Sequence, residues 1–401
     1  MRKYQPLTIQ IDSLAEAELE LSKIGVDVRG IKIMKDKAVF FSIKIKNLTP
    51  PQANIIKQEL LSCGADAATS RDTITSKTKH TDVIIFATVS QFKRLVEKLN
   101  KNHFDLPEIG QEIEKVIKNQ EKPFPVIKFK NAALDINKRT FIMGIINVTP
   151  DSFSDGGKYL NSEAAITHAE ELIKAGADII DIGGESTRPG SREIGFKEEL
   201  ARVLPVVKAL SKKTIISVDT RKSQVAEACL KAGAEIINDI SALNYDKKMA
   251  KIISKHKACA ILMHMQGTPQ SMQVSPHYDD IIPELCAYLE NSIEIALKAG
   301  ILSHRIIIDP GFGFGKNLGH NLTILKKLKE LKSLGFPILV GTSRKSMIGQ
   351  ILDVPPKERI FGSAATNVVA ILNGANIIRL HDVFEIKQAA KMADAIIRRK
   401  G

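Results

Sequence analysis

From about residue 140 to the end of the chain, short Ile/Val-rich runs alternate with longer segments of helical periodicity. Near-continuous apolar runs separated by amphipathic helices are typical of parallel strands that are buried on both faces. Gly176, Gly233 and Gly374 each end a helix just before such a run. Eight runs are predicted as strands: Phe141–Val148, Asp178–Gly183, Thr214–Asp219, Glu235–Asp239, Ala258–His264, Arg305–Asp309, Pro337–Gly341 and Asn376–Leu380. The fold class is therefore α/β, and eight units predict a (β/α)8 TIM barrel.

The first third of the chain predicts a small α/β domain, over residues 1–119. Strands are expected at Ile31–Met34, Ala38–Lys46 and Val83–Val89, and helices at Pro50–Ser62, Gln91–Lys101 and Leu106–Asn119. A charged linker with two prolines follows at 120–126, and residues 127–401 form the barrel domain. Within Val126–Thr140 a hairpin is expected to close the end of the barrel opposite the strand ends.

Composition narrows the possible classes of protein. The chain has 401 residues, which is enough for two domains. Its four cysteines form no CxxC pair, as is typical of a reducing, cytoplasmic environment and not of a metal or disulfide framework. The sequence predicts neither a signal peptide nor a membrane span.

The net charge of +13 raises the question of nucleic-acid binding. Residues 1–130 carry 22 Lys and Arg against 16 Asp and Glu, and the remainder carries 36 against 29, so the excess is spread along the chain. No basic block interleaves with aromatic residues, and the chain has no Trp and five Tyr. General solvation with modest attraction for anionic substrates is therefore favoured over nucleic-acid binding.

Polar residues stand where the predicted strands end. The active site of a TIM barrel is built at the carboxyl ends of its strands, so these residues are expected to converge at one mouth. They are Asn147, Asp181, Asp219, Asn238, Asp309, Gly341 and Arg379.

Several motifs at these positions resemble those of dihydropteroate synthases. The first is Met-Gly-Ile-Ile-Asn-Val-Thr-Pro-Asp-Ser-Phe-Ser-Asp-Gly-Gly at 143–157, where an apolar run passes into a polar loop. Others are Ser186-Thr187-Arg188-Pro189-Gly190, Ile-Asp-Pro-Gly-Phe-Gly-Phe-Gly-Lys ending at Lys316, Ser343-Arg344-Lys345-Ser346, and Arg379-Leu380-His381. The resemblance covers roughly residues 127–398 and leaves the first third unexplained.

The resemblance implies a folate-pathway transferase. Such an enzyme joins 6-hydroxymethyl-7,8-dihydropterin pyrophosphate to para-aminobenzoate, giving 7,8-dihydropteroate and pyrophosphate. The implied mechanism is a dissociative substitution assisted by Mg²⁺, without a side-chain nucleophile. Positioning and electrostatics supply the rate.

The resemblance also implies roles for individual residues. Asp309 would accept from the guanidine-like pterin edge, with Asp219 and Asn238 around the ring and Lys345 reaching its carbonyl and nitrogen face. Asp181 and Gly341 belong to the same substrate pocket, and Phe314 would form an aromatic wall.

Further matches concern the phosphates and the second substrate. Asn147 and Asp155 match a Mg²⁺-proximal pair. Arg379 and His381 match residues that hold the phosphates, and the Arg379 guanidinium could also stack on the ring. Residues Thr187, Arg188, Pro189 and Ser346 match the aminobenzoate site.

Two other readings stay open on the sequence. A methyltetrahydrofolate:corrinoid methyltransferase would share the fold and the pterin-edge residues, and a catalytically silent barrel could serve as an interaction protein. The motifs around Lys345 and Arg379 favour the synthase, because they suit a pyrophosphate and a carboxylate. The expected partners are the two substrates, with a homodimer and without nucleic acid or membrane. The N-terminal domain reads as an assembly or regulatory module.

Overall fold

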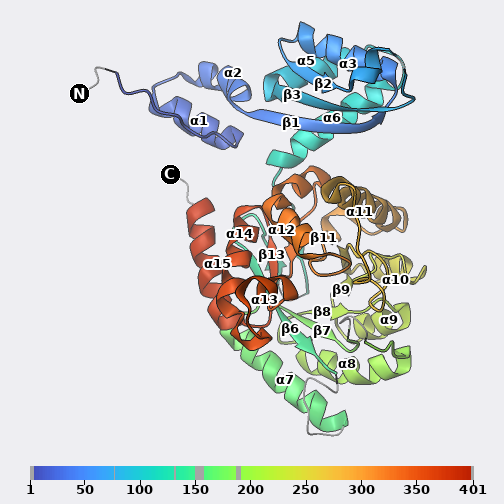
Figure 1. Cartoon of the computed structure of the whole chain (residues 1–401). Coiled ribbons are helices and arrows are strands. Elements are labelled where there is room, and N and C mark those ends of the chain that lie inside the picture. Colours follow the sequence, from blue (N-terminus) through green and yellow to red (C-terminus); the bar gives the residue numbers. More distant parts are fainter. Residues whose placement is uncertain (1–3, 76, 131, 150–157, 187–190, 399–401) are drawn as a thin grey trace. The chain divides into compact units, whose positions relative to one another are not determined.

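The computed structural model describes residues 4–75, 77–130, 132–149, 158–186 and 191–398. It divides the chain into two compact units, Met1–Lys122 and Pro123–Gly401, which are described separately below (Figure 1). Asp155, Thr187, Arg188 and Pro189, which were named from the sequence, lie outside the described residues.

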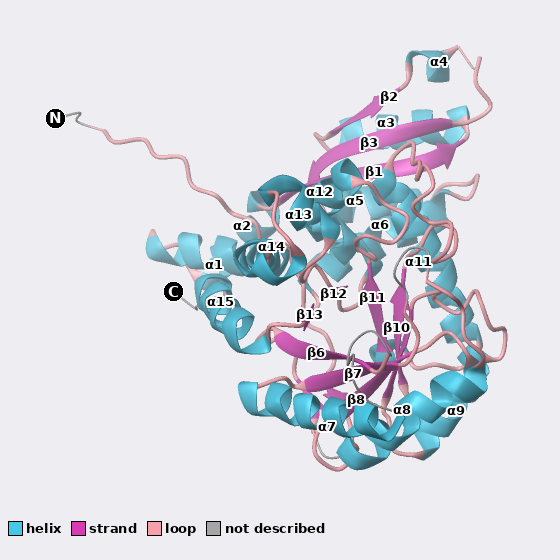
Figure 2. Ribbon diagram, turned by 60° about the horizontal axis from the view of Figure 1, so that its bottom comes forward, coloured by secondary structure: helices cyan, strands magenta, loops and turns pink. Residues whose placement is uncertain are grey.

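The C-terminal unit is a barrel of eight parallel strands surrounded by helices (Figure 2). The strands are β6 (Phe141–Asn147), β7 (Ile179–Gly183), β8 (Ile215–Asp219), β9 (Ile236–Asp239), β10 (Cys259–Met263), β11 (Ile306–Asp309), β12 (Leu339–Val340) and β13 (Ile377–Leu380). Their order in the sheet is β11-β10-β9-β8-β7-β6-β13-β12. A parallel bridge between Ile308 and Ile338 joins β11 to β12 and closes the ring. The predicted fold class and all eight predicted strands are confirmed.

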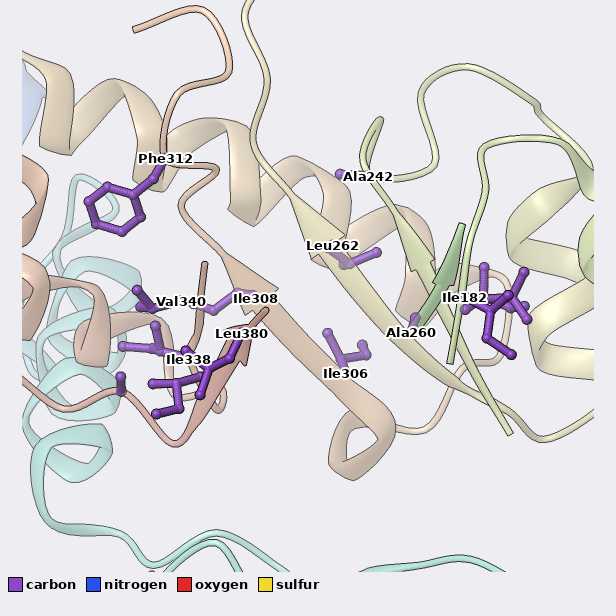
Figure 3. Close-up of a cluster of buried hydrophobic side chains, with 14 of the residues drawn as sticks. Ile182, Ala242, Ala260, Leu262, Ile306, Ile308, Phe312, Ile338, Val340 and Leu380 are labelled. Atoms are coloured by element: carbon purple, nitrogen blue, oxygen red, sulfur yellow. The ribbon is translucent and has the colours of Figure 1, made fainter. Parts of the chain in front are cut away.

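Helices follow the strands in alternation. They are α7 (Lys158–Ala175), α8 (Phe196–Leu210), α9 (Ser223–Lys231), α10 (Met249–Lys255), α11 (Ile281–Lys298), α12 (Leu318–Lys326), α13 (Ser346–Leu352), α14 (Ile360–Leu372) and α15 (Val383–Ile397). Outward-facing strand residues such as Ile182 and Ile308 pack in one large apolar cluster with these helices. Figure 3 shows part of it, with Ile308, Ile338, Val340 and Leu380 gathered where the ring closes.

The interior of the barrel is apolar at the amino ends of its strands. Residues such as Met143, Ile179, Ile261 and Ile377 meet there in a second cluster. A hairpin of β4 (Ile127–Lys128) and β5 (Ala133–Leu134) adds Ile127, Leu134 and Ile136 to this cluster. The predicted hairpin therefore fills the end of the barrel opposite the carboxyl ends of the strands.

The N-terminal unit is a three-stranded antiparallel sheet with helices. The strands β1 (Phe40–Leu48), β2 (Asp66–Thr69) and β3 (Thr81–Thr88) lie in the order β1-β3-β2. The helices are α1 (Leu14–Lys23), α2 (Val28–Ala38), α3 (Pro50–Ser62), α4 (Arg71–Ile74), α5 (Val89–Leu99) and α6 (Leu106–Glu121). Side chains from α3, α5 and α6 pack on one face of the sheet around Phe92 and Ile85.

One strand prediction in this unit is wrong. Ile31–Met34 lies inside α2, whose first turn is capped by the Asp27 carboxylate accepting from the amides of Arg29 and Gly30. The alternation of Ile31 and Ile33 imitates a strand over four residues, but the cap starts a helix before it. Helix α1 and strand β2 were not predicted. Across the described residues of the whole chain, no helix is both long and apolar enough to cross a membrane.

We predict that Ile127→Ala destabilises the barrel by about 2–5 kcal/mol, because Ile127 is fully buried in the hairpin and its loss leaves a cavity. Calorimetric unfolding of the full chain measures the change. The matched control is the neighbouring Val126→Ala, since Val126 is 39% exposed and should change stability by less than about 0.5 kcal/mol. Equal effects of the two substitutions would show that the hairpin does not support the barrel.

Candidate functional site

Inside the barrel, polar side chains replace apolar ones at the carboxyl ends of the strands. Asp181 of β7 pairs in register with Ser217 of β8, and Asp219 of β8 with Asn238 of β9. Asp309 ends β11 and Arg379 lies in β13. Because side chains alternate along a strand, the same face that is apolar at the amino ends carries these groups at the carboxyl ends.

Arg379 lies between two carboxylates. Its Nε donates to Asp181 Oδ2 at 2.7 Å, and its Nη2 donates to Asp219 Oδ2 at 2.9 Å. Burial alone would lower the pKa of Arg379, but the carboxylates of Asp181 and Asp219 raise it above its usual value. Gly341 lies beside Arg379, and a Cβ at Gly341 would be in ordinary van der Waals contact with the Arg379 Cβ at 3.7 Å. The guanidinium plane is thus fixed from two strands.

Asp181 also holds a second group. It is fully buried, and its Oδ2 accepts from Asn238 Nδ2 at 3.0 Å in addition to Arg379. Three buried oxygens nearby have no hydrogen-bond partner in the described structure: Asp181 Oδ1, Asn238 Oδ1 and Ser217 Oγ. Buried polar atoms without partners are uncommon, so this wall of the barrel interior is suited to a polar ligand or water.

The carboxyl group of Asp219 has an unusual pKa. Burial raises it to about 7; the Arg379 guanidinium opposes this shift, and the charge of Asp181 adds to it. Asp219 can therefore exchange a proton near neutral pH when a ligand changes its surroundings.

Asp309 and Lys345 lie on the other side of the mouth. Asp309 Oδ1 accepts from the amide of Gly311 at 2.7 Å, and burial raises the pKa of this carboxyl against the opposing ammonium of Lys345. Lys345 Nζ donates to the carbonyl of Phe312 and lies 4.9 Å from the ring centroid of Phe314. Burial lowers the pKa of Lys345 to about 8.

The loop after β11 approaches neighbouring backbone closely. A Cβ at Gly311 would lie 2.0 Å from the carbonyl oxygen of His264, and Gly311 has a φ of 68°. Lys316 holds this loop in place. Its Nζ donates to the carbonyl of Gly311 at 2.9 Å and to that of Phe314 at 3.0 Å. The same Nζ lies 2.9 Å from His264 Nδ1. Gly311 is therefore needed for this close backbone packing.

His381 follows β13 directly. Its Nδ1 lies 3.2 Å from Ser343 Oγ, and burial together with the neighbouring charge of Arg379 lowers its pKa to about 4. His381 is therefore neutral at pH 7. Arg344, next to Lys345, makes a double hydrogen bond with Asp382, which ties the β12–α13 loop to the loop after β13.

Asn147 and Ser346 lie at the edge of this group. Asn147 ends β6, and the Cβ position of Gly183 is 3.6 Å from both Asn147 Oδ1 and Asp219 Cβ, so the two side chains flank Gly183. Ser346 begins α13 and is exposed. Within the described residues no three His, Cys, Asp or Glu side chains form a metal cluster. Mg²⁺ needs few protein ligands when water and phosphate complete its shell, so the Asn147 amide oxygen is compatible with such a site.

Three buried residues of this region were not singled out from the sequence as site residues. Ser217 stands two positions before Asp219 and therefore on the same face of β8, which the period of two could have revealed. Lys316 and His264 are both buried, and their mutual contact joins segments 52 residues apart. Nothing in the local pattern predicts that contact.

The comparisons with known proteins agree with this arrangement. The family model of pterin binding enzymes matches residues 143–381, which include every site residue that was predicted from the sequence. A dihydropteroate synthase from Synechocystis is 47% identical over 277 residues, covering 68% of this chain and 96% of that protein. Fold and site thus define a pterin-binding enzyme.

Two solved structures have the same barrel. A Yersinia pestis dihydropteroate synthase with a sulfonamide drug is 46% identical with a TM-score of 0.65, covering 69% of this chain and 100% of that one. A dihydropteroate synthase from Xanthomonas albilineans in complex with 7,8-dihydropteroate is 39% identical with a TM-score of 0.62, covering 68% and 98%. The chain belongs to the dihydropteroate synthase family.

One relative extends through the N-terminal unit as well. A probable bifunctional folylpolyglutamate synthase/dihydropteroate synthase from Halobacterium salinarum is 39% identical over 386 residues. The match covers 96% of this chain and 46% of that protein. The N-terminal unit therefore has a counterpart in a longer relative.

We predict that Gly311→Ala destabilises the protein by more than the roughly 1–2 kcal/mol cost of a left-handed Ala, because its Cβ would also clash with the His264 carbonyl. The control is Gly313→Ala, which has a φ of 79° but no atom closer than 3.5 Å to the new Cβ. Thermal unfolding compares the two variants. A Gly311→Ala variant as stable as Gly313→Ala would contradict the close approach.

Proposed function

We propose that the chain acts as a dihydropteroate synthase, condensing 6-hydroxymethyl-7,8-dihydropterin pyrophosphate with para-aminobenzoate and releasing pyrophosphate. The observation that carries this proposal is the Arg379 guanidinium held between Asp181 and Asp219 inside a pterin-binding barrel. The named relatives are synthases, so the comparisons do not favour the methyltransferase alternative.

The pterin would lie across the buried carboxylates. Asp309 and Asp219 offer acceptor oxygens to its guanidine-like edge, and Asn238 offers an amide with one unpaired oxygen. Lys345 would reach the carbonyl and nitrogen face of the ring, and Phe314 would form the aromatic wall. Asp181, fully buried, contributes by fixing Arg379 and Asn238. This arrangement recognises a flat ring that carries adjacent donors.

The pyrophosphate would lie at the mouth. Arg379 supplies a positive charge and a flat face for the ring, and the neutral His381 supplies a hydrogen-bonding imidazole. Asn147 and Asp155 would hold Mg²⁺, which neutralises charge on the leaving pyrophosphate. The residues of the chain then orient the pterin methylene toward the amine, without a covalent intermediate on the protein.

Thr187, Arg188, Pro189 and Ser346 would form the aminobenzoate site. The resemblance of their motifs supports this assignment. The sulfonamide drug in complex with the Yersinia relative supports aminobenzoate as the second substrate, since such drugs share an aromatic amine with it. We assign residues 127–401 to catalysis, because the family model lies within this range and the Synechocystis relative is covered to 96% by 277 residues of this chain. The four unpaired cysteines fit the proposed cytoplasmic location.

Product analysis tests the proposed function directly. The full chain is incubated with labelled para-aminobenzoate, the dihydropterin pyrophosphate and Mg²⁺, and the labelled product is identified by mass. Labelled 7,8-dihydropteroate is the expected product, and its absence would falsify the assignment. Chelation should abolish turnover, and full activity after chelation would remove Mg²⁺ from the proposal. A parallel assay of residues 123–401 measures the contribution of the N-terminal unit.

Arg379→Lys should weaken binding of the dihydropterin pyrophosphate by about 1.5–3 kcal/mol, because an ammonium cannot donate to Asp181 and Asp219 and also present a flat face. Titration calorimetry measures the affinity. Arg398→Lys is the control, since Arg398 pairs with Asp394 away from the strand ends and should bind as the parent does. Unchanged affinity in Arg379→Lys would contradict the assignment.

Pterin affinity should fall as the pH drops through about 7, the pKa of Asp219 in the free protein. A protonated Asp219 loses acceptor capacity, so the dissociation constant rises by up to about tenfold per pH unit below that value. Calorimetry with 6-hydroxymethyl-7,8-dihydropterin, which lacks the titrating pyrophosphate, gives the profile. In Asp219→Asn the loss of affinity below about pH 7 should disappear. If the loss persisted in this variant, another titrating group would be its cause.

We propose a homodimer through helices α14 and α15. They pack side by side and expose Phe361, Phe384, Met392 and Ile396, each at least 63% exposed. The last three follow one another at intervals of eight and four residues and share the exposed side of α15. An apolar stripe of this kind marks an interaction surface. Sedimentation should show a dimer that Phe384→Glu converts to monomer, whereas Lys231→Ala on α9, outside this stripe, should leave it intact.

A further inference from the structure

A second group of charged residues lies outside the pterin site, and four of its side chains, Glu185, Glu199, Arg221 and Lys222, are less than a tenth exposed. It lies where β7 and β8 end and where α8 begins. The group, here called the loop-base network, consists of Glu185, Glu193, Glu199, Arg221, Lys222 and Tyr245. The reaction proposed above uses none of these side chains.

Lys222 connects two carboxylates from different elements. Its Nζ donates to Glu199 Oε2 of α8 at 2.6 Å and to Glu185 Oε2, just after β7, at 2.9 Å. The side chains of Lys222, Glu199 and Glu185 are 8%, 1% and 9% exposed. Lys222 follows β8. Its ammonium therefore bonds both to the residue just after β7 and to helix α8, which lie at the two ends of the segment connecting β7 to α8.

Glu185 extends the connection to the returning chain. Its Oε1 accepts from the amide of Ile194 at 2.9 Å, and Ser191 Oγ donates to the carbonyl of Ser186. The outgoing stem, 185–186, and the returning stem, 191–194, are therefore bound to each other. Gly184 brings the outgoing stem against α8, since a Cβ there would lie 2.7 Å from Val203 and 3.1 Å from Glu199.

Arg221 forms a second anchor beside Lys222. It lies 3.2 Å from Glu193 of the returning stem and 3.6 Å from Glu185 of the outgoing one. Its guanidinium also stacks over the Tyr245 ring at 4.3 Å, and Tyr245 Oη donates to Glu193 at 2.5 Å. Two adjacent cations thus hold both stems.

Energetics point to a positioning role for this network. Removing charges from water costs several kcal/mol per ion, and well-packed apolar residues often replace a buried ion pair without loss of stability. Two buried carboxylates, Glu185 and Glu199, facing the two buried cations are a poor way to stabilise a fold. They are a good way to fix one geometry, because each partner has few alternative contacts.

The network is continuous with the proposed active site. Lys222 and Arg221 follow Asp219 by three and two residues, and Glu185 follows Gly183, the register partner of Asp219, by two. The charge of Glu199 also contributes to the raised pKa of Asp219. The stems flank the residues assigned above to aminobenzoate.

We propose that Lys222 is a positioning residue for the second substrate: by holding Glu185 and Glu199 it sets the geometry of the two stems on which the aminobenzoate site stands. This inference rests on the proposed function. It concerns aminobenzoate and not the pterin, because the network forms its ion pairs and hydrogen bonds with the two stems and not with the residues assigned to the pterin.

The decisive variant removes the buried charges together. Glu185→Gln, Glu199→Gln and Lys222→Met in one chain leave no unpaired ion, and the amide oxygen introduced by Glu185→Gln can still accept from the Ile194 amide. The full-length variant should unfold as cooperatively as the parent. Its KM for para-aminobenzoate should rise about tenfold to hundredfold, because the pocket for this substrate would be misplaced. The KM for the dihydropterin pyrophosphate should stay within about twofold of the parent's value.

Three single variants, Lys222→Arg, Lys222→Met and Lys231→Met, complete the comparison. Lys222→Arg retains a cation and should restore most of the aminobenzoate affinity relative to Lys222→Met. Lys231→Met is the matched control, since Lys231 lies at the other end of α9 and pairs with Glu227 with a side chain 63% exposed. It should leave both KM values unchanged.

The outcomes separate the two claims. A triple variant with the parent's aminobenzoate KM, or with both KM values raised alike, overturns the inference and leaves the synthase activity standing. A triple variant that no longer unfolds cooperatively also overturns it, because the network is then structural. A parent chain that makes no dihydropteroate overturns the proposed function and the inference with it.

Discussion

The contact of Arg379 with the carboxylates of Asp181 and Asp219 is the constraint on which the carboxyl-end half of the barrel interior depends. Asp181 and Asp219 lie on neighbouring strands, and without a cation between them their charges would repel in a dry interior. The guanidinium bridges both at hydrogen-bond distance, and Asp181 passes the constraint on to Asn238. One cation therefore fixes the positions of three acceptor-bearing groups from three strands.

The balance of charge around this contact suits the proposed reaction. Asp181, Asp219 and Asp309 face Arg379 and Lys345, and burial shifts the pKa values of Asp219, Asp309 and Lys345 toward the neutral forms. A pterin that becomes cationic as pyrophosphate departs would be stabilised by the carboxylates beneath it. The departing anion would meet Arg379 at the mouth. Fixed charges of both signs, separated across the ring, act without reorganising during the reaction.

The sequence predicts the barrel well because its strands are apolar on both faces and its helices end in glycine. It predicts which residues face the mouth, since a polar residue at the end of a buried strand has few other roles. It fails at Ile31–Met34, where four residues of alternation lie inside a capped helix. It also cannot supply partners: the Arg379–Asp181 contact joins residues 198 apart, and only the closed ring brings β13 beside β6, one strand away from β7.

The two halves of the barrel interior divide stability from function. The lower half, filled by the hairpin and by apolar side chains such as Met143 and Ile261, gains free energy from burial and contains no unsatisfied polar group among those described. The half at the carboxyl ends of the strands is destabilised by buried carboxylates and by oxygens without hydrogen-bond partners. The strands run from the apolar half into the polar half, so packing in the apolar half holds their carboxyl ends rigid. The buried carboxylates at those ends can then keep a single arrangement. Function at the carboxyl ends therefore depends on packing at the amino ends.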